Sequence, residues 1–341
     1  MCSRLHILPG QRYWSRRAVL AGGVGFLAGC RGGNANTPLR LQVLKNSLPS
    51  VWVRRFRRRH PIELGTQPQL QDLYKQLDQP RPPHLLTLGL GWLPIALQKQ
   101  QLSPWQPNAL TRWRELPPQW QTVLSAQGQL WLIPYRWGAT ALAYRRDKLT
   151  WQPQGWESLW RPELRQQVSA IAQFRELLAL CFIRLGLSIN TPAPWPIPDL
   201  KAQLQTLHQQ IRLYSDQHYL KPLVLGDVAM AVGWSSDLFA VAQRYPQIQV
   251  VVPPGGVIWA DGWVLPARQP VSPVMTEWLN FCWEPEQTVS LEKQGIAWSP
   301  FARQLQQYTF LQPMNPTTKA AYTSLRQWWV NLPPVTSASL S

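Results

Sequence analysis

From residue 39 onward, the chain alternates between strand-like and helix-like patterns of apolar and polar positions. Residues 39–44 alternate strictly, as expected of a strand with one buried face. Residues 84–90 are almost wholly apolar, which predicts a strand buried on both faces. A helix-like segment follows each strand, at about residues 51–59 and from Leu93 onward. Strand followed by helix, repeated, predicts an α/β fold.

A second series of strands and helices follows in the middle of the chain, and further helices follow in its C-terminal part. Its predicted strands are residues 168–172, 228–234 and 248–254, and the predicted helices are residues 175–187, 200–211, 273–283, 286–293 and 319–330. Proline-rich residues 188–200 predict a loop. Proline-bearing stretches at 133–138 and 261–266 are where we expect the chain to cross between two lobes. We predict one lobe from residues 39–138 plus 261–301, and the other from residues 139–260 plus 302–335.

The first 29 residues predict an export signal. Arg16 and Arg17 precede an apolar stretch at 18–28, whose 11 residues are too few to span a bilayer that needs about 20. The Ser-Arg-Arg-x-apolar order resembles a twin-arginine signal, and Leu-Ala-Gly-Cys at 27–30 resembles a bacterial lipobox. We therefore predict lipidation of Cys30, a linker over residues 30–38, and a membrane-anchored envelope lipoprotein. An ordinary signal peptide with an incidental cysteine is the alternative.

The net charge of +17 suggests anionic neighbours, but the basic residues are scattered and no nucleic-acid-binding motif occurs. We therefore expect no nucleic-acid partner. The densest basic run, residues 54–60, predicts a solvated helix face with Trp52 and Phe56 turned inward. A membrane-facing patch is the alternative for this run.

Motifs of catalysis and of metal or cofactor binding are absent from the sequence. The histidines of the mature chain stand alone, no GxSxG elbow occurs, and no glycine-rich phosphate loop follows a predicted strand. Cys181 and Cys282 lie in apolar, helix-like runs, which predicts free buried thiols, with a disulfide as the alternative. We expect neither an enzyme nor a bound metal or cofactor.

Three stretches carry a family resemblance, and their order and spacing hold from about Leu39 to Leu305. They are a Pro-Tyr-x-Trp-Gly-x-Thr crossover within residues 133–149, an acidic turn and strand ending in tryptophan within residues 226–237, and a Trp-x-Asp-x-x-x-x-Pro return crossover within residues 257–266. Together they resemble the bacterial spermidine/putrescine-binding proteins, the extracellular solute-binding subunits of ABC importers. The resemblance implies a two-lobed periplasmic-binding-protein fold, type II-like, with a ligand cleft between the lobes and two crossover strands as hinge.

The resemblance also implies ligand-binding residues. Trp259 and Asp261 match the tryptophan and the ammonium-binding aspartate of the return crossover. Trp234 matches the tryptophan that walls the polyamine chain, and Glu176 matches a glutamate that meets the other ligand end.

Other positions depart from the family pattern. Trp92 stands where the family has a tyrosine, and Gln173 stands where it has an aspartate, so one anionic contact is missing. The early Trp-x-x-Tyr pair is absent at residues 44–50, and Ala297 or Trp298 replaces the late tyrosine. The predicted ligand-binding set is Trp92, Gln173, Glu176, Trp234, Trp259 and Asp261.

The predicted residue set suits a flexible chain that carries ammonium groups. Tryptophan faces attract ammonium groups by ~0.5–2 kcal/mol each, and a carboxylate can hold each charged end. On this interpretation Asp261 is tolerated between two indoles because the ligand brings the counter-charge. We predict the substrate-binding component of an ABC importer for a polyamine or related cationic amine, a monomer that partners permease subunits. The alternatives are a protein that binds a neutral solute such as a sugar, and a surface lipoprotein with an eroded cleft.

Overall fold

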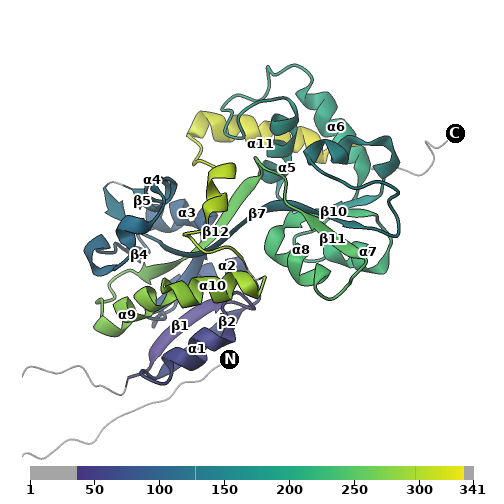
Figure 1. Cartoon of the computed structure of the whole chain (residues 1–341). Helices are drawn as coiled ribbons and strands as arrows, with labels where there is room; N and C mark the ends of the chain where they lie inside the picture. Colours follow the sequence, from purple (N-terminus) through teal and green to yellow (C-terminus); the bar gives the residue numbers. More distant parts are fainter. Residues whose placement is uncertain (1–36, 127, 296, 334–341) are drawn as a thin grey trace, which may run out of the picture. The chain divides into compact units, whose positions relative to one another are not determined.

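The long strand β7 (Ile133–Arg145) connects the two halves of the main sheet (Figure 1). The computed structural model describes residues 37–333 except residues 127 and 296. All β7 side chains from Ile133 to Tyr144 are buried, because different strands pair with successive stretches of β7 and pack it into both halves. The predicted signal segment and the predicted lipidation site Cys30 lie outside the described residues.

The first half of the sheet has the order β2-β1-β3-β12-β7. Strand β1 (Leu39–Leu44) is parallel to β2 (Ile62–Gln67) and β3 (Leu85–Gly89). Strand β12 (Val257–Pro266) lies between β3 and β7 and is antiparallel to both. The helices of this half are α1 (Ser50–Phe56), α2 (Leu70–Lys75), α3 (Leu93–Gln98), α4 (Pro118–Leu124), α9 (Pro273–Cys282) and α10 (Pro285–Lys293).

The second half continues from the other end of β7. Strands β10 (Met230–Trp234) and β11 (Ile248–Val251) are antiparallel to β7, and β8 (Val168–Ala170) is parallel to β10 and to β9 (Ile211–Tyr214). Its helices are α5 (Phe174–Arg184), α6 (Leu200–Gln210), α7 (Leu220–Leu225), α8 (Ser235–Ala242) and α11 (Pro316–Val330).

Shorter elements complete the description. The short strands are β4 (Leu102–Ser103), β5 (Ser125–Ala126), β6 (Gln129–Leu130) and β13 (Thr309–Phe310). Single 3₁₀ turns cover Gln76–Asp78, Leu90–Trp92, Pro107–Ala109, Trp113–Glu115, Trp156–Trp160, Pro162–Leu164 and Arg303–Gln307. The 3₁₀ turn that ends at Trp92 matters most, because it follows β3 directly and places a predicted site residue at the end of that strand.

Separate hydrophobic cores define two lobes. The core of the first lobe includes Leu41, Trp52, Trp120, Trp263 and Trp278. The main core of the second lobe includes Leu142, Phe182, Leu204, Val232 and Leu325. Burial of apolar side chains in two groups agrees with the predicted division into two lobes. The exact boundaries stay a prediction, and Leu305 and Phe310 pack in the first core although we expected residues 302–335 in the second lobe.

Most long strands and helices lie within a few residues of their predicted positions, but several elements were not predicted, among them β2, β9, α4, α7 and α8. Strand β2 buries only Ile62, so it has no alternating apolar pattern to detect. Helix α8 begins at Ser235, directly after the strand that ends at Trp234, and no loop separates the two elements. Residues 188–199 contain no strand or helix, as their prolines predicted.

The basic run is an exposed helix face, as predicted, only up to the end of α1 at Phe56, and residues 57–59 form a turn. Trp52 and Phe56 are buried, whereas the arginines at 54, 57, 58 and 59 are exposed. Arg55 pairs with Glu286 at 2.9 Å between Nη2 and Oε1. Cys181 and Cys282 are both free and buried, which confirms free thiols rather than a disulfide. Within the described part of the chain, no helix combines the length and apolar character needed to cross a bilayer.

Candidate ligand-binding site

Three of the predicted site residues pair with alternate residues of β7, whose side chains point to one face of the sheet. Alternate residues of a strand point to the same face, and directly opposed residues on antiparallel strands share that face. The opposed pairs are Arg136 with Asp261, Gly138 with Trp259, and Thr140 with Trp234. The candidate site is therefore a row of cross-strand pairs along the middle of β7, where the two lobes are joined.

Gly138 makes room for the indole of Trp259. A Cβ atom at position 138 would lie 2.3 Å from Cζ2 of Trp259 and 2.5 Å from Oγ of Ser235. Both distances are far below van der Waals contact, so no other residue fits there without a shift. Trp259 Nε1 is buried and has no hydrogen-bond acceptor among the described residues.

Asp261 forms a buried ion pair with Arg136. The guanidinium donates from Nε at 2.8 Å and approaches from Nη2 at 2.5 Å, both to Oδ2 of the carboxylate. Asp261 is 4% exposed and Arg136 is 6% exposed. The same guanidinium lies 5.1 Å from the ring centre of Trp259, within the range of a cation–π contact. This corrects our interpretation that a ligand must supply the counter-charge of Asp261, because the protein supplies it.

Trp92 lies at the Asp261 end of the row. Its ring stacks on Tyr74, with ring centres 4.9 Å apart. A Cβ atom at Gly89 would lie 3.5 Å from Oδ1 of Asp261 and 3.6 Å from Cδ1 of Trp92. Trp92 and the carboxylate oxygen that does not contact Arg136 are therefore brought together around Gly89.

Glu176 lies at the other end of the row, in the first turn of α5. Thr140 Oγ1 donates to its Oε2 at 2.6 Å, and Trp234 Nε1 donates to its Oε1 at 3.3 Å. Burial raises the pKa of Glu176 to about 7, although both hydrogen bonds act to lower it. In the described part of the chain, no cationic side chain pairs with this carboxylate. Trp234 and Glu176, predicted separately, thus contact each other directly.

Gln173 lies beside an aspartate that the sequence did not reveal. Its Nε2 donates to Oδ2 of Asp216 at 2.7 Å, and the Ala172 backbone N–H donates to Oδ1 at 2.8 Å. The negative charge of Asp216 adds to the rise in the pKa of Glu176, so the two carboxyls influence each other. We expected an anionic contact to be missing at Gln173, and Asp216 provides an acid next to that position.

Two further charged residues of this region were missed. Asp237 accepts hydrogen bonds from Tyr219 Oη at 3.2 Å and Ser236 Oγ at 3.3 Å. Burial raises the pKa of Asp237, and the positive charge of Arg136 partly opposes that rise. The sequence does contain one indication of Arg136, because it is the single charged residue in the otherwise uncharged stretch from Ile133 to Tyr144.

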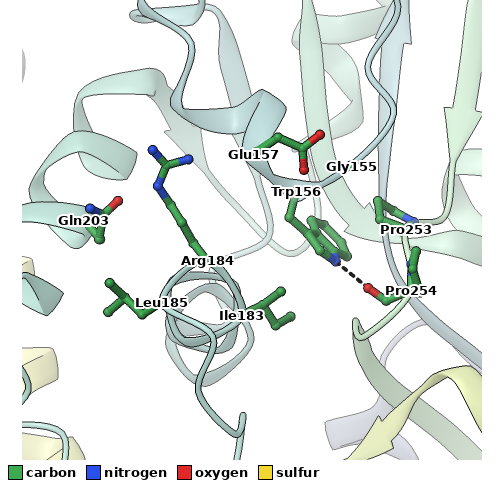
Figure 2. Close-up of a pocket in the computed structure, with 9 residues that line it drawn as sticks. All are labelled: Gly155, Trp156, Glu157, Ile183, Arg184, Leu185, Gln203, Pro253 and Pro254. Atoms are coloured by element: carbon green, nitrogen blue, oxygen red, sulfur yellow. Dashed lines mark hydrogen bonds between the residues drawn. The ribbon is translucent and has the colours of Figure 1, made fainter.

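A surface pocket of about 520 Å³ lies elsewhere, in the second lobe (Figure 2). Figure 2 shows Trp156 beside Pro253 and Pro254, with Glu157 next to Trp156 and Arg184 across from them. Trp156 Nε1 donates to the Pro254 carbonyl at 3.1 Å. None of the predicted ligand-binding residues lines this pocket.

Comparison with known families settles the class of the protein. Residues 62–307 match the family model of bacterial extracellular solute-binding proteins. The chain belongs to this family. It is a family of substrate-binding transport components located outside the cytoplasmic membrane, and this agrees with the class predicted from the sequence.

Individual relatives of this solute-binding protein support the fold. The spermidine/putrescine-binding periplasmic protein of Salmonella typhimurium is 26% identical over 183 residues, 52% of each chain. The chain therefore spans about half the length of the curated relatives it matches. A spermidine/putrescine ABC transporter substrate-binding protein from Streptococcus pneumoniae has a TM-score of 0.77 at 15% identity, covering 86% of this chain and 98% of that one.

A solute-binding protein from Thermotoga lettingae, bound with α-D-tagatose, has a TM-score of 0.62 at 13% identity, covering 77% of this chain and 81% of that one. At such identities the structural likeness shows the fold alone. It confirms the predicted two-lobed α/β fold of periplasmic binding proteins.

Proposed function

We propose that this solute-binding protein is the substrate-binding component of an ABC importer and binds a polyamine or a related cationic amine. The spermidine/putrescine binding of the Salmonella relative supports the ligand class, and the match covers 52% of each chain. The proposal includes delivery of the amine to permease subunits by a monomeric protein. It also includes export by the twin-arginine route and anchoring through a lipid on Cys30.

The observation that carries the proposal is the state of Glu176. The half-buried carboxylate of Glu176 receives hydrogen bonds only from the neutral groups of Thr140 and Trp234, so it has no counter-charge of its own. An ammonium group would supply that charge, and hydrogen bonds to charged groups contribute ~1.5–3 kcal/mol. Asp216 adds negative charge on the same side, and Trp234 adds an aromatic ring for the methylene chain.

A neutral solute is the second candidate, and the Arg136–Asp261 pair favours it. This pair satisfies one predicted ammonium-binding carboxylate without any ligand. Tryptophans also stack on sugar faces, and a structure of the same fold holds α-D-tagatose. On this alternative, Trp92, Trp234 and Trp259 would bind the solute and Glu176 would accept hydrogen bonds from its hydroxyl groups.

A binding panel tests the proposal. Thermal shift and calorimetry on the purified protein would compare putrescine, spermidine, singly charged amines and sugars, since a ligand raises Tm only if it binds the folded state. We expect amines to bind and sugars not to bind. Glu176→Gln should weaken amine binding by roughly 10- to 150-fold, because it removes a charge at constant size. Glu163→Gln, at an exposed acid of the same lobe, is the matched control and should change nothing. Sugar binding without amine binding would establish the second candidate instead.

A further inference from the structure

The guanidinium of Arg136 occupies the kind of environment that a protein builds for a ligand cation. It is held by the Asp261 carboxylate on one side, and its carbon lies 5.1 Å from the Trp259 ring centre. An acid together with an aromatic face is the standard combination for binding an ammonium group. Here the charge of Asp261 and the face of Trp259 are already matched by a side chain of the protein, which contacts only Oδ2 of the carboxylate.

The opposite end of the row has the complementary property. Glu176 and Asp216 are two acids that influence each other, and no cationic side chain of the described chain pairs with either of them. The two ends lie four residues apart along β7, which strand geometry puts at about 13 Å. This separation is comparable with the length of an extended aliphatic amine. One end of the row therefore requires a cation and the other end already has one.

Two hydrogen-bond donors at the Arg136 end are unused. Arg136 donates to Asp261 through Nε and contacts it through Nη2, whereas its Nη1 makes no hydrogen bond with the described residues. Trp259 Nε1 is buried and has no acceptor in the same part of the chain. Both donors belong to side chains in direct contact. A buried donor without an acceptor is costly, so a ligand acceptor that reaches Trp259 Nε1, with Arg136 Nη1 beside it, would be favourable here.

We infer that Arg136 is a specificity-determining residue that selects an amine with a single ammonium group and a neutral hydrogen-bond acceptor at its other end. The ammonium group binds Glu176, and the acceptor, such as the carbonyl of an acylated amine, binds the free donors of Arg136 and Trp259. A second ammonium group would meet the guanidinium as a like charge, which disfavours unmodified diamines. This inference rests on the proposed function and narrows its ligand class.

The matched probes are putrescine and N-acetylputrescine, which differ in whether the second amine is charged or capped by an acyl group. We expect calorimetry to show that the protein prefers N-acetylputrescine by about tenfold or more, since one like-charge contact has such an effect. Arg136→Met removes the cation and frees Asp261, so the preference should reverse toward putrescine. Arg136→Lys retains a cation and should keep the original preference.

The double variant Arg136→Met with Asp261→Asn is the critical control. It removes the cation and the acid together, so the preference for putrescine should not appear. Because Arg136→Met leaves a buried carboxylate unpaired, its Tm without ligand is expected to fall. Putrescine should then raise the Tm of this variant more than it raises the Tm of the natural protein.

Two results would overturn the inference. Equal or tighter binding of putrescine by the natural protein, with an unchanged ratio in Arg136→Met, overturns the inference alone and leaves the proposed function intact. Binding of no amine at all overturns both.

Discussion

Gly138 and Trp259 face each other across β7 and β12, and the missing side chain of the glycine is what lets the indole lie against the strand. A Cβ at Gly138 would come within 2.3 Å of the Trp259 ring. The ring in turn lies 5.1 Å from the Arg136 guanidinium carbon, which Asp261 holds in place. The Trp259 indole thus contacts both Gly138 of β7 and the Arg136–Asp261 ion pair, which joins β7 to β12.

Gly138→Ala should therefore displace Trp259 and weaken ligand binding. Forcing an extra methyl group into a packed region costs typically ~1–3 kcal/mol, so we expect a lower Tm together with a lower amine affinity. Urea denaturation and calorimetry would measure the two effects. Gly91→Ala is the control, because a Cβ at Gly91 would meet no atom within 4 Å although the residue adjoins Trp92. Equal effects of both substitutions would mean that the space at Gly138 is not critical.

The Arg136–Asp261 pair should show strong coupling in a double-mutant cycle. Removing one partner of a buried pair typically costs ~3–5 kcal/mol, because the other charge stays buried without compensation. Arg136→Met and Asp261→Asn should each lower the free energy of unfolding by about that amount, whereas the double variant should lose much less than their sum. The exposed Arg161–Glu163 pair, at 2.8 Å, provides the comparison. The coupling energy of this exposed pair should be ~1 kcal/mol or less. Similar coupling energies for both pairs would contradict the conclusion that Arg136 and Asp261 form a strongly coupled buried ion pair.

The predicted lipid anchor can be tested on the full chain. Replacing Cys30 by Ala should remove the acylation site, so the protein should lose acyl labelling and leave the membrane fraction. Replacing Arg16 and Arg17 by Lys should impair export if the twin-arginine route is used. Unchanged acyl labelling of the Cys30→Ala protein would argue against the lipobox, and normal export of the lysine variant would indicate the general export pathway.

Many of the strands and helices could be predicted from local patterns in the sequence. The alternation in residues 39–44 and the apolar run before Leu90 reflect the burial of single strands. Such a pattern can be detected from residues that are adjacent in the sequence. Strand β1 (Leu39–Leu44) and strand β3 (Leu85–Gly89) accordingly lie where they were predicted. Strand β2 (Ile62–Gln67) buries a single side chain, so it left no such pattern.

The candidate site could be predicted less completely, because its charges are matched between distant parts of the chain. Arg136 and Asp261 are 125 residues apart, and Gln173 and Asp216 are 43 apart. Family resemblance pointed to Asp261 and Gln173 but gave no account of their partners. Only the register of β7 against β12 reveals that Arg136 lies opposite Asp261.

The affinity for an amine should rise with pH up to the pKa of Glu176. Burial, with a contribution from the charge of Asp216, raises that pKa to about 7 against the opposing hydrogen bonds from Thr140 and Trp234. An ammonium group binds the carboxylate and not the carboxylic acid, so at lower pH the site must first release a proton. We expect the Kd to fall about tenfold for each pH unit up to about pH 7 and to level off above it. Calorimetry in two buffers of different ionisation enthalpy would also measure the released proton.

The stability of the ligand-free protein should follow the opposite trend. Because the folded pKa of Glu176 exceeds its ordinary value of 4.5, the folded state holds the proton more tightly than the unfolded state. This contribution to stability is fully present below pH 4.5 and is lost as the pH rises to about 7. Glu176→Gln should abolish the pH dependence of amine binding and remove this contribution to the pH dependence of stability, whereas Glu163→Gln should keep both. An amine Kd that stays constant across this range in the natural protein would show that the ligand does not bind the Glu176 carboxylate.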